Sequence, residues 1–402
     1  MSNTTKAEQA TIDSALAQAR ELVRTLEAFD GTSNNKLSLL KRASNICKAL
    51  EEPFDVATRW LETISTTAAL HVLIRIKAFE KLPAKGSIAA SDIASECDVD
   101  VSIITRAMRI LIVNGIAQET QRDEYSHNAL SRSFLPTEFG SMTCMFVEFS
   151  RALAALPDYV KSHKPEEIFD LKKTPFAFSV GCEGKTYYEV YDLDPQKRTL
   201  WDIGMQKLGN HIPVIGMFPF ENLEDQVKKQ PGNPFVVDVG GGRGQALLAI
   251  QEHCKGSFGG KLILQDLPIV LDSLTLDEIP GIEPMPYSIF TLQPVKNAHI
   301  YLFRHLLMDY PDAKVVEILK NTVSAMGSES RLIINEMLVP DRVTAGDQQM
   351  VYLFDIMLLA MSGRERSLSE YRRIFDGVGL ELVKEHRSEG HQTMMLETRL
   401  KA

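Results

Sequence analysis

The sequence predicts an α/β protein in which a Rossmann-like domain with a doubly wound parallel sheet follows a mostly helical domain that contains a winged helix. Three observations predict this fold class. The first eighty residues repeat apolar side chains at helical spacing, the next fifty are typical of short helices and a hairpin, and about 170 C-terminal residues alternate apolar strands with helices. We expect an N-terminal domain over 1–135, connector helices over 136–233 and the sheet domain over 234–402.

Amphipathic helices are expected first. Apolar residues form one stripe from Ile12 to Leu26 and another from Leu37 to Leu50. A third run, from Phe54 to Phe79, is apolar on more than one face. Helices of this kind bury their surface against something larger. We interpret the third run as a homodimer interface, and an intramolecular core is the alternative.

A winged helix is expected next. A helix over 101–113 precedes two short strands, 116–119 and 124–127, which form the wing. The helix that would read DNA offers only Arg106 and Arg109 among apolar residues, so it is predicted to be buried. The formal net charge of −9 also repels a polyanion, and we expect no nucleic-acid partner.

The composition indicates the cellular compartment in which the protein is expected. The five cysteines are scattered without a Cys-x-x-Cys pair, which favours reduced thiols and predicts no structural metal. The N-terminus lacks an apolar signal core, and the longest apolar stretch, 350–361, is short and interrupted by Asp355. We expect a soluble cytoplasmic protein with no membrane association.

Strands of the sheet domain are predicted from apolar runs between helical stretches. Two further strands near the C-terminus are expected to close the sheet as a hairpin. The predicted strands cover residues 235–239, 261–265, 298–303 and 331–336, with the hairpin at 380–385 and 393–398.

The first strand leads directly into Gly240-Gly241-Gly242-Arg243-Gly244 and then a helix over 245–254. Glycines let the backbone approach a ligand closely, and the helix start presents free N–H donors. A dinucleotide loop would require a third glycine at Gln245, whereas the pattern here is Gly-x-Gly-x-Gly. The strand, loop and helix therefore indicate a nucleotide-type ligand other than a dinucleotide.

Two carboxylates identify that ligand. Asp238 lies just before the loop, where a buried acid suits a ligand that carries an ammonium group better than one that carries phosphates. Asp266 ends the second strand, where a carboxylate can accept hydrogen bonds from two ribose hydroxyls. The glycine loop and Asp266, in register after successive strands, together with Asp238 ahead of the loop, predict S-adenosylmethionine (SAM).

With these motifs in place, the chain resembles the plant and fungal small-molecule O-methyltransferases, in which a helical dimerisation and winged-helix domain precedes a class I SAM-methyltransferase domain. The most specific stretches are 236–244, 264–268, 304–312 and 363–367. The resemblance implies a cofactor site formed by Asp238, Gly240, Gly242, Asp266, Leu267, Ser288, Ile289 and Arg304. It also implies a substrate cavity lined by the connector helices and by Trp201, Asp202, Met205, Met308, Phe354, Met357 and Met361.

The chain departs from that family at its catalytic base. The family usually has His-Asp-Trp where this chain has Met308-Asp309-Tyr310, and the histidine takes the proton of the substrate hydroxyl. A thioether cannot take a proton, so the loss of the base removes a factor on the order of 10²–10⁴ in rate. The two flanking acids remain as Glu336 and Glu365. Ser288 also replaces a common aspartate near the adenine and is expected to weaken one contact.

This departure leaves three functions open. In the first, the chain resembles the fungal SAM-dependent pericyclases, which dehydrate and cyclise polyketide or pyridone intermediates without consuming SAM. The second is an O-methyltransferase in which His305, Glu336 or Glu365 activates the hydroxyl. The third is a catalytically silent SAM-binding or winged-helix regulator. We expect the first.

Pericyclic chemistry needs a shaped apolar cavity and hydrogen-bond donors. His305 and His127 have other interpretations, as a packed or surface histidine and as a solvent-facing wing residue. The candidate catalytic residues are Arg304, His305, His127, Glu336, Glu365 and Asp309.

Overall fold

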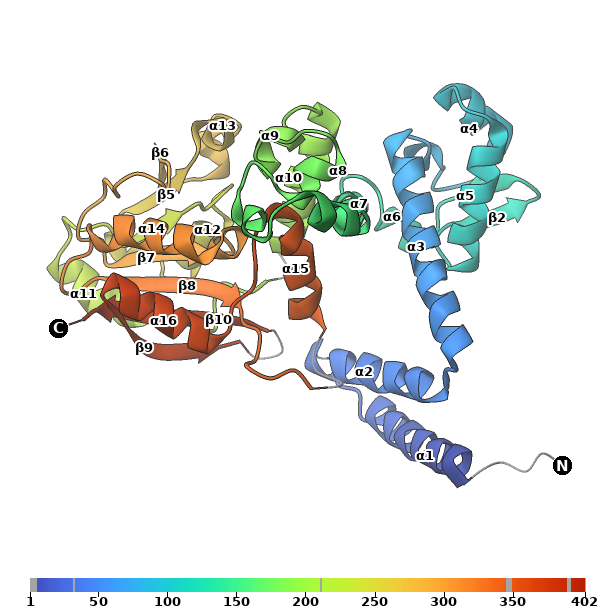
Figure 1. Ribbon diagram of the computed structural model, residues 1–402, viewed down its shortest axis with the longest axis horizontal. Coiled ribbons are helices and arrows are strands. Elements are labelled where there is room, and N and C mark those ends of the chain that lie inside the picture. The colour runs from blue at the N-terminus through green and yellow to red at the C-terminus, as the bar shows by residue number, and fades with distance from the viewer. Residues whose placement is uncertain (1–5, 32, 210–211, 345–348, 389–391, 402) are drawn as a thin grey trace. The chain divides into compact units, whose positions relative to one another are not determined.

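The computed structural model describes residues 6–31, 33–209, 212–344, 349–388 and 392–401. Its contacts form two compact units, Met1–Pro136 and Thr137–Ala402 (Figure 1).

The first unit is mostly helical, as the sequence predicts. Its three short strands form an antiparallel sheet in the order β1-β3-β2. Its elements are α1 (Lys6–Glu27), α2 (Ser33–Leu50), α3 (Pro53–Arg75), η1 (Phe79–Lys81), β1 (Ile88–Ala89), α4 (Ala90–Cys97), α5 (Val101–Val113), β2 (Gln118–Gln121), β3 (Glu124–Ser126) and α6 (Ala129–Arg132).

The winged helix is built around α5. The Asp100 carboxylate caps this helix by accepting from the Ser102 N–H at 2.8 Å, so the helix begins where the sequence indicates. One face of α5 is buried through Ile104, Ala107, Met108 and Leu111. Arg106 and Arg109 lie on the exposed face. The helix is thus a core element whose apolar side faces inward, as expected, while its two arginines face solvent.

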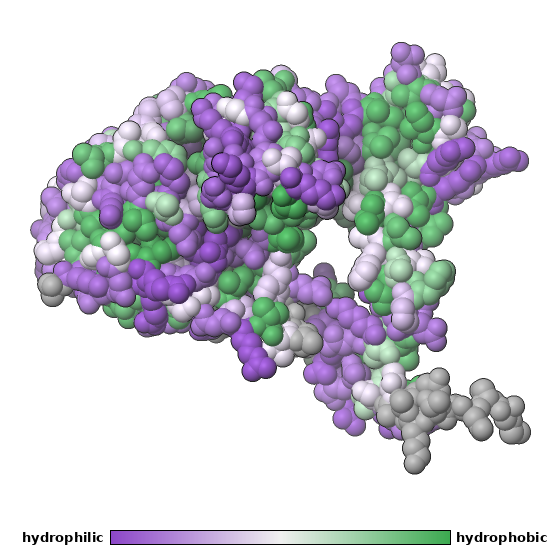
Figure 2. Space-filling model, viewed as in Figure 1, coloured by the Kyte–Doolittle hydropathy of each residue, from purple (hydrophilic) through white to green (hydrophobic). Residues whose placement is uncertain are grey.

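The first three helices expose large apolar side chains, and Figure 2 shows apolar surface along α3. Among the described residues of α1, only Ala15 is buried. A face of this kind is unusual on a protein surface unless a partner covers it. The large exposed apolar residues described in the three helices are Ile12, Leu16, Val23, Leu26, Leu40, Leu50, Phe54, Trp60, Leu61, Ile64 and Val72.

The second unit begins with helices and continues into a seven-stranded sheet. The strand order is β6-β5-β4-β7-β8-β10-β9, and β10 runs antiparallel to both its neighbours while the other pairs are parallel. The strands are β4 (Val236–Val239), β5 (Leu262–Asp266), β6 (Ile282–Pro286), β7 (Ile300–Arg304), β8 (Arg331–Met337), β9 (Leu380–Arg387) and β10 (Thr393–Leu400).

Helices cover both faces of this sheet (Figure 1). Val237 and Val239 of β4 pack in one core cluster with residues of α14 and α16, while Val236 packs on the other face with residues of α11 and α12. This alternation follows from the two-residue period of a strand. The helices of the unit are α7 (Phe139–Ser162), η2 (Pro165–Phe169), α8 (Pro175–Ser179), α9 (Tyr187–Tyr191), α10 (Pro195–Gly209), η3 (Phe220–Leu223), α11 (Glu224–Lys229), α12 (Gln245–His253), η4 (Ser257–Gly259), α13 (Pro268–Leu271), η5 (Leu276–Glu278), η6 (Leu307–Asp309), α14 (Asp312–Val323), α15 (Met350–Leu358), η7 (Leu359–Met361) and α16 (Leu368–Val378).

The predicted strands and the terminal hairpin are confirmed. The sequence did not predict β1 in the first unit nor, in the seven-stranded sheet, β6. It reads Ile-Glu-Pro-Met-Pro, and two prolines in five residues argue against a strand because proline cannot donate to a ladder. The two prolines are tolerated because β6 lies at the edge of the sheet and pairs only with β5.

Candidate cofactor and active site

The glycine loop after β4 has the backbone that its residues predict. Gly240, Gly242 and Gly244 have φ values of 69°, 59° and 79°, in the left-handed region that favours glycine. A Cβ on Gly240 would lie 2.8 Å from Leu306 Cδ2. A Cβ on Gly242 would meet nothing within 4 Å, so this stretch of backbone borders open space. The loop is therefore shaped for close approach of a ligand.

Asp238 is a buried carboxylate without a partner. It is 1% exposed, and neither of its oxygens accepts a hydrogen bond from any described residue. Burial raises the pKa of Asp238 to about 7, and the nearby Arg304 charge opposes this rise. A buried polar group left unpaired in this way is costly, which indicates that a ligand supplies the missing donor.

Arg304 ends β7 and lies within electrostatic reach of Asp238. Its Nη2 donates to the carbonyl oxygens of Gly209 at 3.0 Å and Ile212 at 3.1 Å. Its Nε is buried and has no partner in the described chain. Arg304 thus links the end of α10 to the cofactor side of the sheet.

Asp266 ties two loops of the cofactor site together. Its Oδ2 accepts from the Gly242 N–H at 2.8 Å, and its Oδ1 accepts from the Leu267 N–H at 2.7 Å. Each carboxylate oxygen keeps a further lone pair, as ribose hydroxyls would require. The unpartnered acid for an ammonium and the second acid for a ribose fit SAM, which when bound supplies a methyl group on a positively charged sulfur.

The other predicted cofactor residues follow the carboxyl ends of β5 and β6. Leu267 is 48% exposed next to Asp266. Ser288 follows β6, and its carbonyl accepts from the Thr291 N–H at 2.9 Å. The Ile289 carbonyl accepts from Asn321 Nδ2 at 3.0 Å. The backbone of this adenine-side turn is therefore fixed by hydrogen bonds.

Met308, in the position of the family's histidine, is held between two segments. Its N–H donates to Glu336 Oε1 at 3.0 Å, and its carbonyl accepts from the Arg364 N–H at 2.8 Å. A Cβ on Gly363 would lie 2.4 Å from the Met308 carbonyl oxygen, so only glycine allows this approach. The backbone of η6 is fixed even though its side chain at 308 cannot accept a proton.

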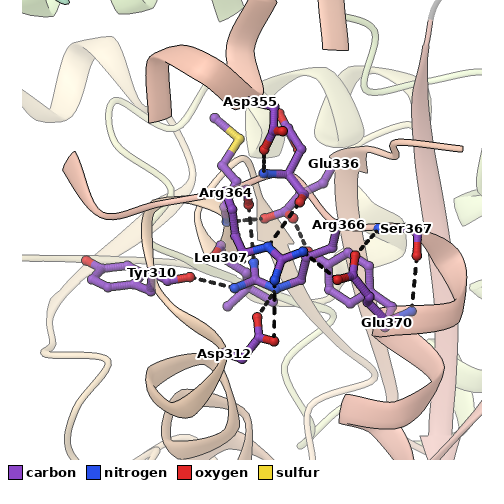
Figure 3. Close-up of polar contacts among 12 residues, drawn as sticks. Leu307, Tyr310, Asp312, Glu336, Asp355, Arg364, Arg366, Ser367 and Glu370 are labelled. Atoms are coloured by element: carbon purple, nitrogen blue, oxygen red, sulfur yellow. Dashed lines mark hydrogen bonds and ion pairs between the residues drawn. The ribbon is translucent and has the colours of Figure 1, made fainter. Parts of the chain in front are cut away.

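Arg366 fixes the rest of this segment (Figure 3). The side chain is completely buried, and its Nε donates to Asp312 Oδ1 at 2.9 Å. Nη1 donates to the Leu307 carbonyl at 3.0 Å, and Nη2 donates to the Tyr310 carbonyl at 2.6 Å. Three bonds from one planar guanidinium hold residues 307–312 in one conformation.

The two retained acids differ in what they can accept. Glu336 is 1% exposed, and its oxygens accept from the Met308 N–H and the Tyr371 hydroxyl. Glu365 is 2% exposed, its N–H donates to Asp355 Oδ1 at 2.9 Å, and its Oε2 has no partner among the described groups. Burial raises the pKa of Glu336 and, with the Glu336 charge nearby, raises the pKa of Glu365 well above its usual range. Glu365 is therefore suited to donate a proton rather than to accept one.

Asp309 makes a contact that the sequence did not predict. Its Oδ2 accepts from the hydroxyl of Tyr188, on α9, at 2.8 Å. Burial raises the pKa of Asp309 to about 7; Tyr188 lowers it and Glu336 raises it. Tyr188 belongs to the short run Tyr-Tyr-Glu-Val-Tyr, and three tyrosines in five residues are the signal that points to this helix.

His305 is an unusual residue beside this group. Its φ of 48° lies in the left-handed region, and its Nε2 is buried without a partner in the described structure. Burial and the Arg304 charge lower the pKa of His305 to about 3. The imidazole is therefore neutral at neutral pH, so it can serve as a neutral donor but holds an extra proton poorly.

His127 belongs to the N-terminal unit. Its Nδ1 lies 2.9 Å from Ser131 Oγ, and its ring meets the Phe79 ring edge-on with centroids 5.3 Å apart. It is 8% exposed, so the solvent-facing interpretation is wrong. Burial lowers the pKa of His127 and keeps it neutral.

Most of the predicted substrate-cavity residues come together. Trp201, Met308, Met357 and Met361 share one buried cluster with α9 tyrosines, and Met205 packs against it. Phe354 belongs to a neighbouring cluster. Asp202 is exposed, and its Oδ1 accepts from Arg198 Nε at 3.0 Å.

No helix in the described ranges is long and apolar enough to cross a membrane. Within the same ranges, no group of His, Cys, Asp or Glu side chains has the arrangement of a metal site.

Known proteins are similar to this chain over nearly its whole length. Residues 59–137 match an O-methyltransferase dimerisation domain, and residues 155–381 match an O-methyltransferase domain. The O-methyltransferase hmp5 of Hypomyces subiculosus is 35% identical over 394 residues, which cover 97% of each chain. The structure of OxaC in complex with SAH and oxaline superposes with a TM-score of 0.84 at 27% identity, covering 97% of this chain and 100% of that one.

The structure of LepI in complex with SAM superposes with a TM-score of 0.79 at 23% identity, covering 97% of this chain and 100% of that one. This likeness shows a shared fold. The family of the chain follows from its sequence. Two domains match over most of its length, and a relative is 35% identical. It belongs to the O-methyltransferase family, as a SAM-dependent methyltransferase-fold enzyme with a helical dimerisation domain ahead of its Rossmann-like domain.

Proposed function

We propose that the protein transfers the methyl group of SAM to a hydroxyl of a small fungal secondary metabolite. The observation that carries the proposal is the unpartnered, buried carboxylate of Asp238 beside the glycine loop, in a chain 35% identical to an O-methyltransferase over nearly its whole length. OxaC, whose structure was solved with SAH and oxaline, supports the same reaction class. Methyl transfer is thus better supported than the pericyclic reaction expected from the sequence.

A pericyclic reaction remains the second candidate because of one observation. Met308 stands where the family has its base, and the neighbouring His305 is neutral and unpartnered, as a donor to a carbonyl or a leaving hydroxyl would be. LepI, at 23% identity, supports the fold and not the reaction.

We also propose that the protein acts as a homodimer. The exposed apolar side chains of α3, including Trp60, Leu61 and Ile64, lie in the stretch that matches the dimerisation domain. A second copy of the chain would cover them.

The test is to incubate the purified protein with SAM and a panel of phenolic and pyridone metabolites, and to follow SAH and products by mass spectrometry. Methyl transfer predicts SAH together with a product heavier by one CH₂ group. Products that have lost water or isomerised while SAM is unconsumed would contradict the proposal and support the pericyclic reaction. SAM binding with no turnover of any compound would contradict both reactions.

A further inference from the structure

We propose that Asp309, positioned by the hydroxyl of Tyr188, is the general base that takes the proton of the substrate hydroxyl, in place of the histidine that Met308 replaces. This inference rests on the proposed methyl transfer. It adds the proton acceptor that the sequence at position 308 lacks.

Asp309 is next to Met308 on η6, and its backbone is fixed. Its N–H donates to the Leu306 carbonyl at 3.2 Å, and the bonds of Arg366 to Leu307 and Tyr310 hold both sides of the turn. A base gains from a fixed position because proton transfer depends on hydrogen-bond geometry.

The Asp309 carboxylate has one oxygen engaged and one oxygen free. Oδ2 accepts from the Tyr188 hydroxyl at 2.8 Å, and no described residue donates to Oδ1. The side chain is 9% exposed, which leaves it in a largely water-free site. Tyr188 therefore orients the carboxylate and leaves one oxygen to accept a proton.

The other titratable groups near Met308 are less suited to the task. Both oxygens of Glu336 are engaged by Met308 and Tyr371. Glu365 is held protonated, because burial raises its pKa well above the usual range. The pKa of His305 is lowered to about 3 by burial, so its imidazole is a weaker base than Asp309.

The basicity of Asp309 suits an acidic hydroxyl. A phenol titrates near pH 10 and an ordinary aspartate near 3.9, a gap of about six pKa units. Burial raises the pKa of Asp309 to about 7, which reduces that gap to about three units. A smaller gap lowers the cost of proton transfer, so acceptors with phenolic or more acidic enolic hydroxyls are the expected substrates.

The pair also lies on the cofactor side of the sheet. Asp309 and Asp266 both act on Tyr188 and Tyr310, and together with burial these charges raise the pKa of both phenols. Asp266 is the acid assigned to the ribose. The proposed base and the ribose acid thus act on the same two tyrosines.

The proposed step balances in atoms and charge. The substrate O–H proton moves to Asp309 Oδ1, and an oxygen electron pair forms the new O–CH₃ bond as the bond from that carbon to sulfur breaks. The sulfur keeps the electron pair of the broken bond and becomes the neutral thioether of SAH. The protonated Asp309 then releases its proton to solvent.

The test compares Asp309→Asn, Asp309→Glu and Tyr188→Phe with the wild type, using the acceptor turned over best in the phenol and pyridone panel. Asp309→Asn is expected to lower kcat by a factor on the order of 10²–10⁴ with unchanged SAM affinity, and Asp309→Glu to recover part of the rate. Asp376→Asn, at an exposed position paired with Lys401, is the matched control and should keep the wild-type rate.

A pH profile separates a base from a structural residue. The titratable groups facing Asp309 are Tyr187, Tyr188, Tyr310, Glu336 and Glu365. The acidic limb of kcat/KM in the wild type should fall near pH 7. Tyr188→Phe should move that limb to higher pH, since the Tyr188 hydroxyl lowers the pKa of Asp309.

Failure of this inference differs from failure of the proposed function. If the wild type forms SAH and Asp309→Asn keeps more than half of its rate, methyl transfer stands and Asp309 is not the base. A second measurement needs no acceptor: because the penalty for ionising Asp309 develops between the ordinary aspartate pKa near 3.9 and the folded pKa of about 7, Asp309→Asn should raise the thermal midpoint at pH 8.5 and leave it nearly unchanged at pH 4. If the variant and the wild type have equal midpoints at both pH values, Asp309 titrates normally in the folded protein, and the inference is overturned.

Discussion

Asp238 and Asp309 are both buried carboxylates with a raised pKa, but we assign them different roles. Burial raises the pKa of each to about 7, but Asp238 has no partner in the described structure, while Asp309 accepts from Tyr188. An unpartnered buried acid fits a cationic ligand. A half-engaged buried acid fits a proton acceptor.

SAM affinity should depend on pH through Asp238. An ammonium prefers the ionised carboxylate, and the free protein must lose the proton of Asp238 to present it. Below the pKa of about 7, affinity should therefore fall by close to tenfold for each pH unit. Isothermal titration with SAM at pH 6 and 8 measures this. Asp238→Asn should bind weakly at both values, and an equally steep pH dependence in that variant would contradict the assignment.

Glu365→Gln should stabilise the protein at alkaline pH. The folded pKa of Glu365 is raised by burial, so the unfolded chain releases this proton first, and the free energy of unfolding falls as the pH rises from about 4.3 toward the folded pKa. Glutamine keeps the shape without that cost. Urea unfolding should show little difference at pH 4 and a more stable variant at pH 9. A variant that is less stable at both values would show that the carboxylate is paired.

Some of these residues could be predicted from the sequence, and the tertiary contacts of others could not. Asp238 and Asp266 could be predicted because each lies at or near the carboxyl end of a strand and the nucleotide loop gives their register. The partner of Asp309 could not, because Tyr188 lies 121 residues away along the chain and no local pattern links the two. The burial of His127 against Phe79 is a tertiary contact of the same kind.

Among the elements, long apolar strands were predictable and the edge strand was not. β4, β5, β7 and β8 are buried along nearly all of their length because helices cover both sheet faces, and each contains a short apolar run. β6 has two prolines, and only its place at the sheet edge makes it a strand. Position in a sheet is set by packing between distant segments, which a local pattern does not contain.

The turn of η6 depends on Arg366, and Arg366→Lys should loosen it. An ammonium cannot reach Asp312, Leu307 and Tyr310 in the three directions of the guanidinium, and a buried charge loses partners. We expect a loss of about 3 kcal/mol in the free energy of unfolding, measured in urea. Arg372→Lys, at an exposed pair with Glu385, should cost less than about 0.5 kcal/mol. Equal effects of the two changes would contradict the role of Arg366.

At the scale of the whole molecule, the main feature is the exposed apolar faces of the first three helices. Helical periodicity predicted α1 to α3, and the exposure of their apolar stripes could be seen only in the structure. These faces match a surface built for a partner.

Leu61→Glu should weaken the proposed homodimer. Two copies of the charge would enter a dry interface, and a cost of about 2 kcal/mol or more corresponds to a dissociation constant raised at least roughly thirtyfold. Sedimentation velocity over a range of protein concentrations measures the change. Leu292→Glu, at a leucine 70% exposed in the second unit, should leave the association unchanged. A monomeric wild type would refute the proposed dimer.

The internal position of β10 has a consequence for synthesis. This strand pairs with both β8 and β9, so the sheet cannot close until residue 400 has been added. The glycine loop is made about 160 residues earlier, which at 5–20 residues per second is a delay on the order of ten to thirty seconds. During translation, the central strands therefore leave the ribosome as apolar segments without their final neighbours, and chaperones that bind nascent chains have that interval in which to protect them.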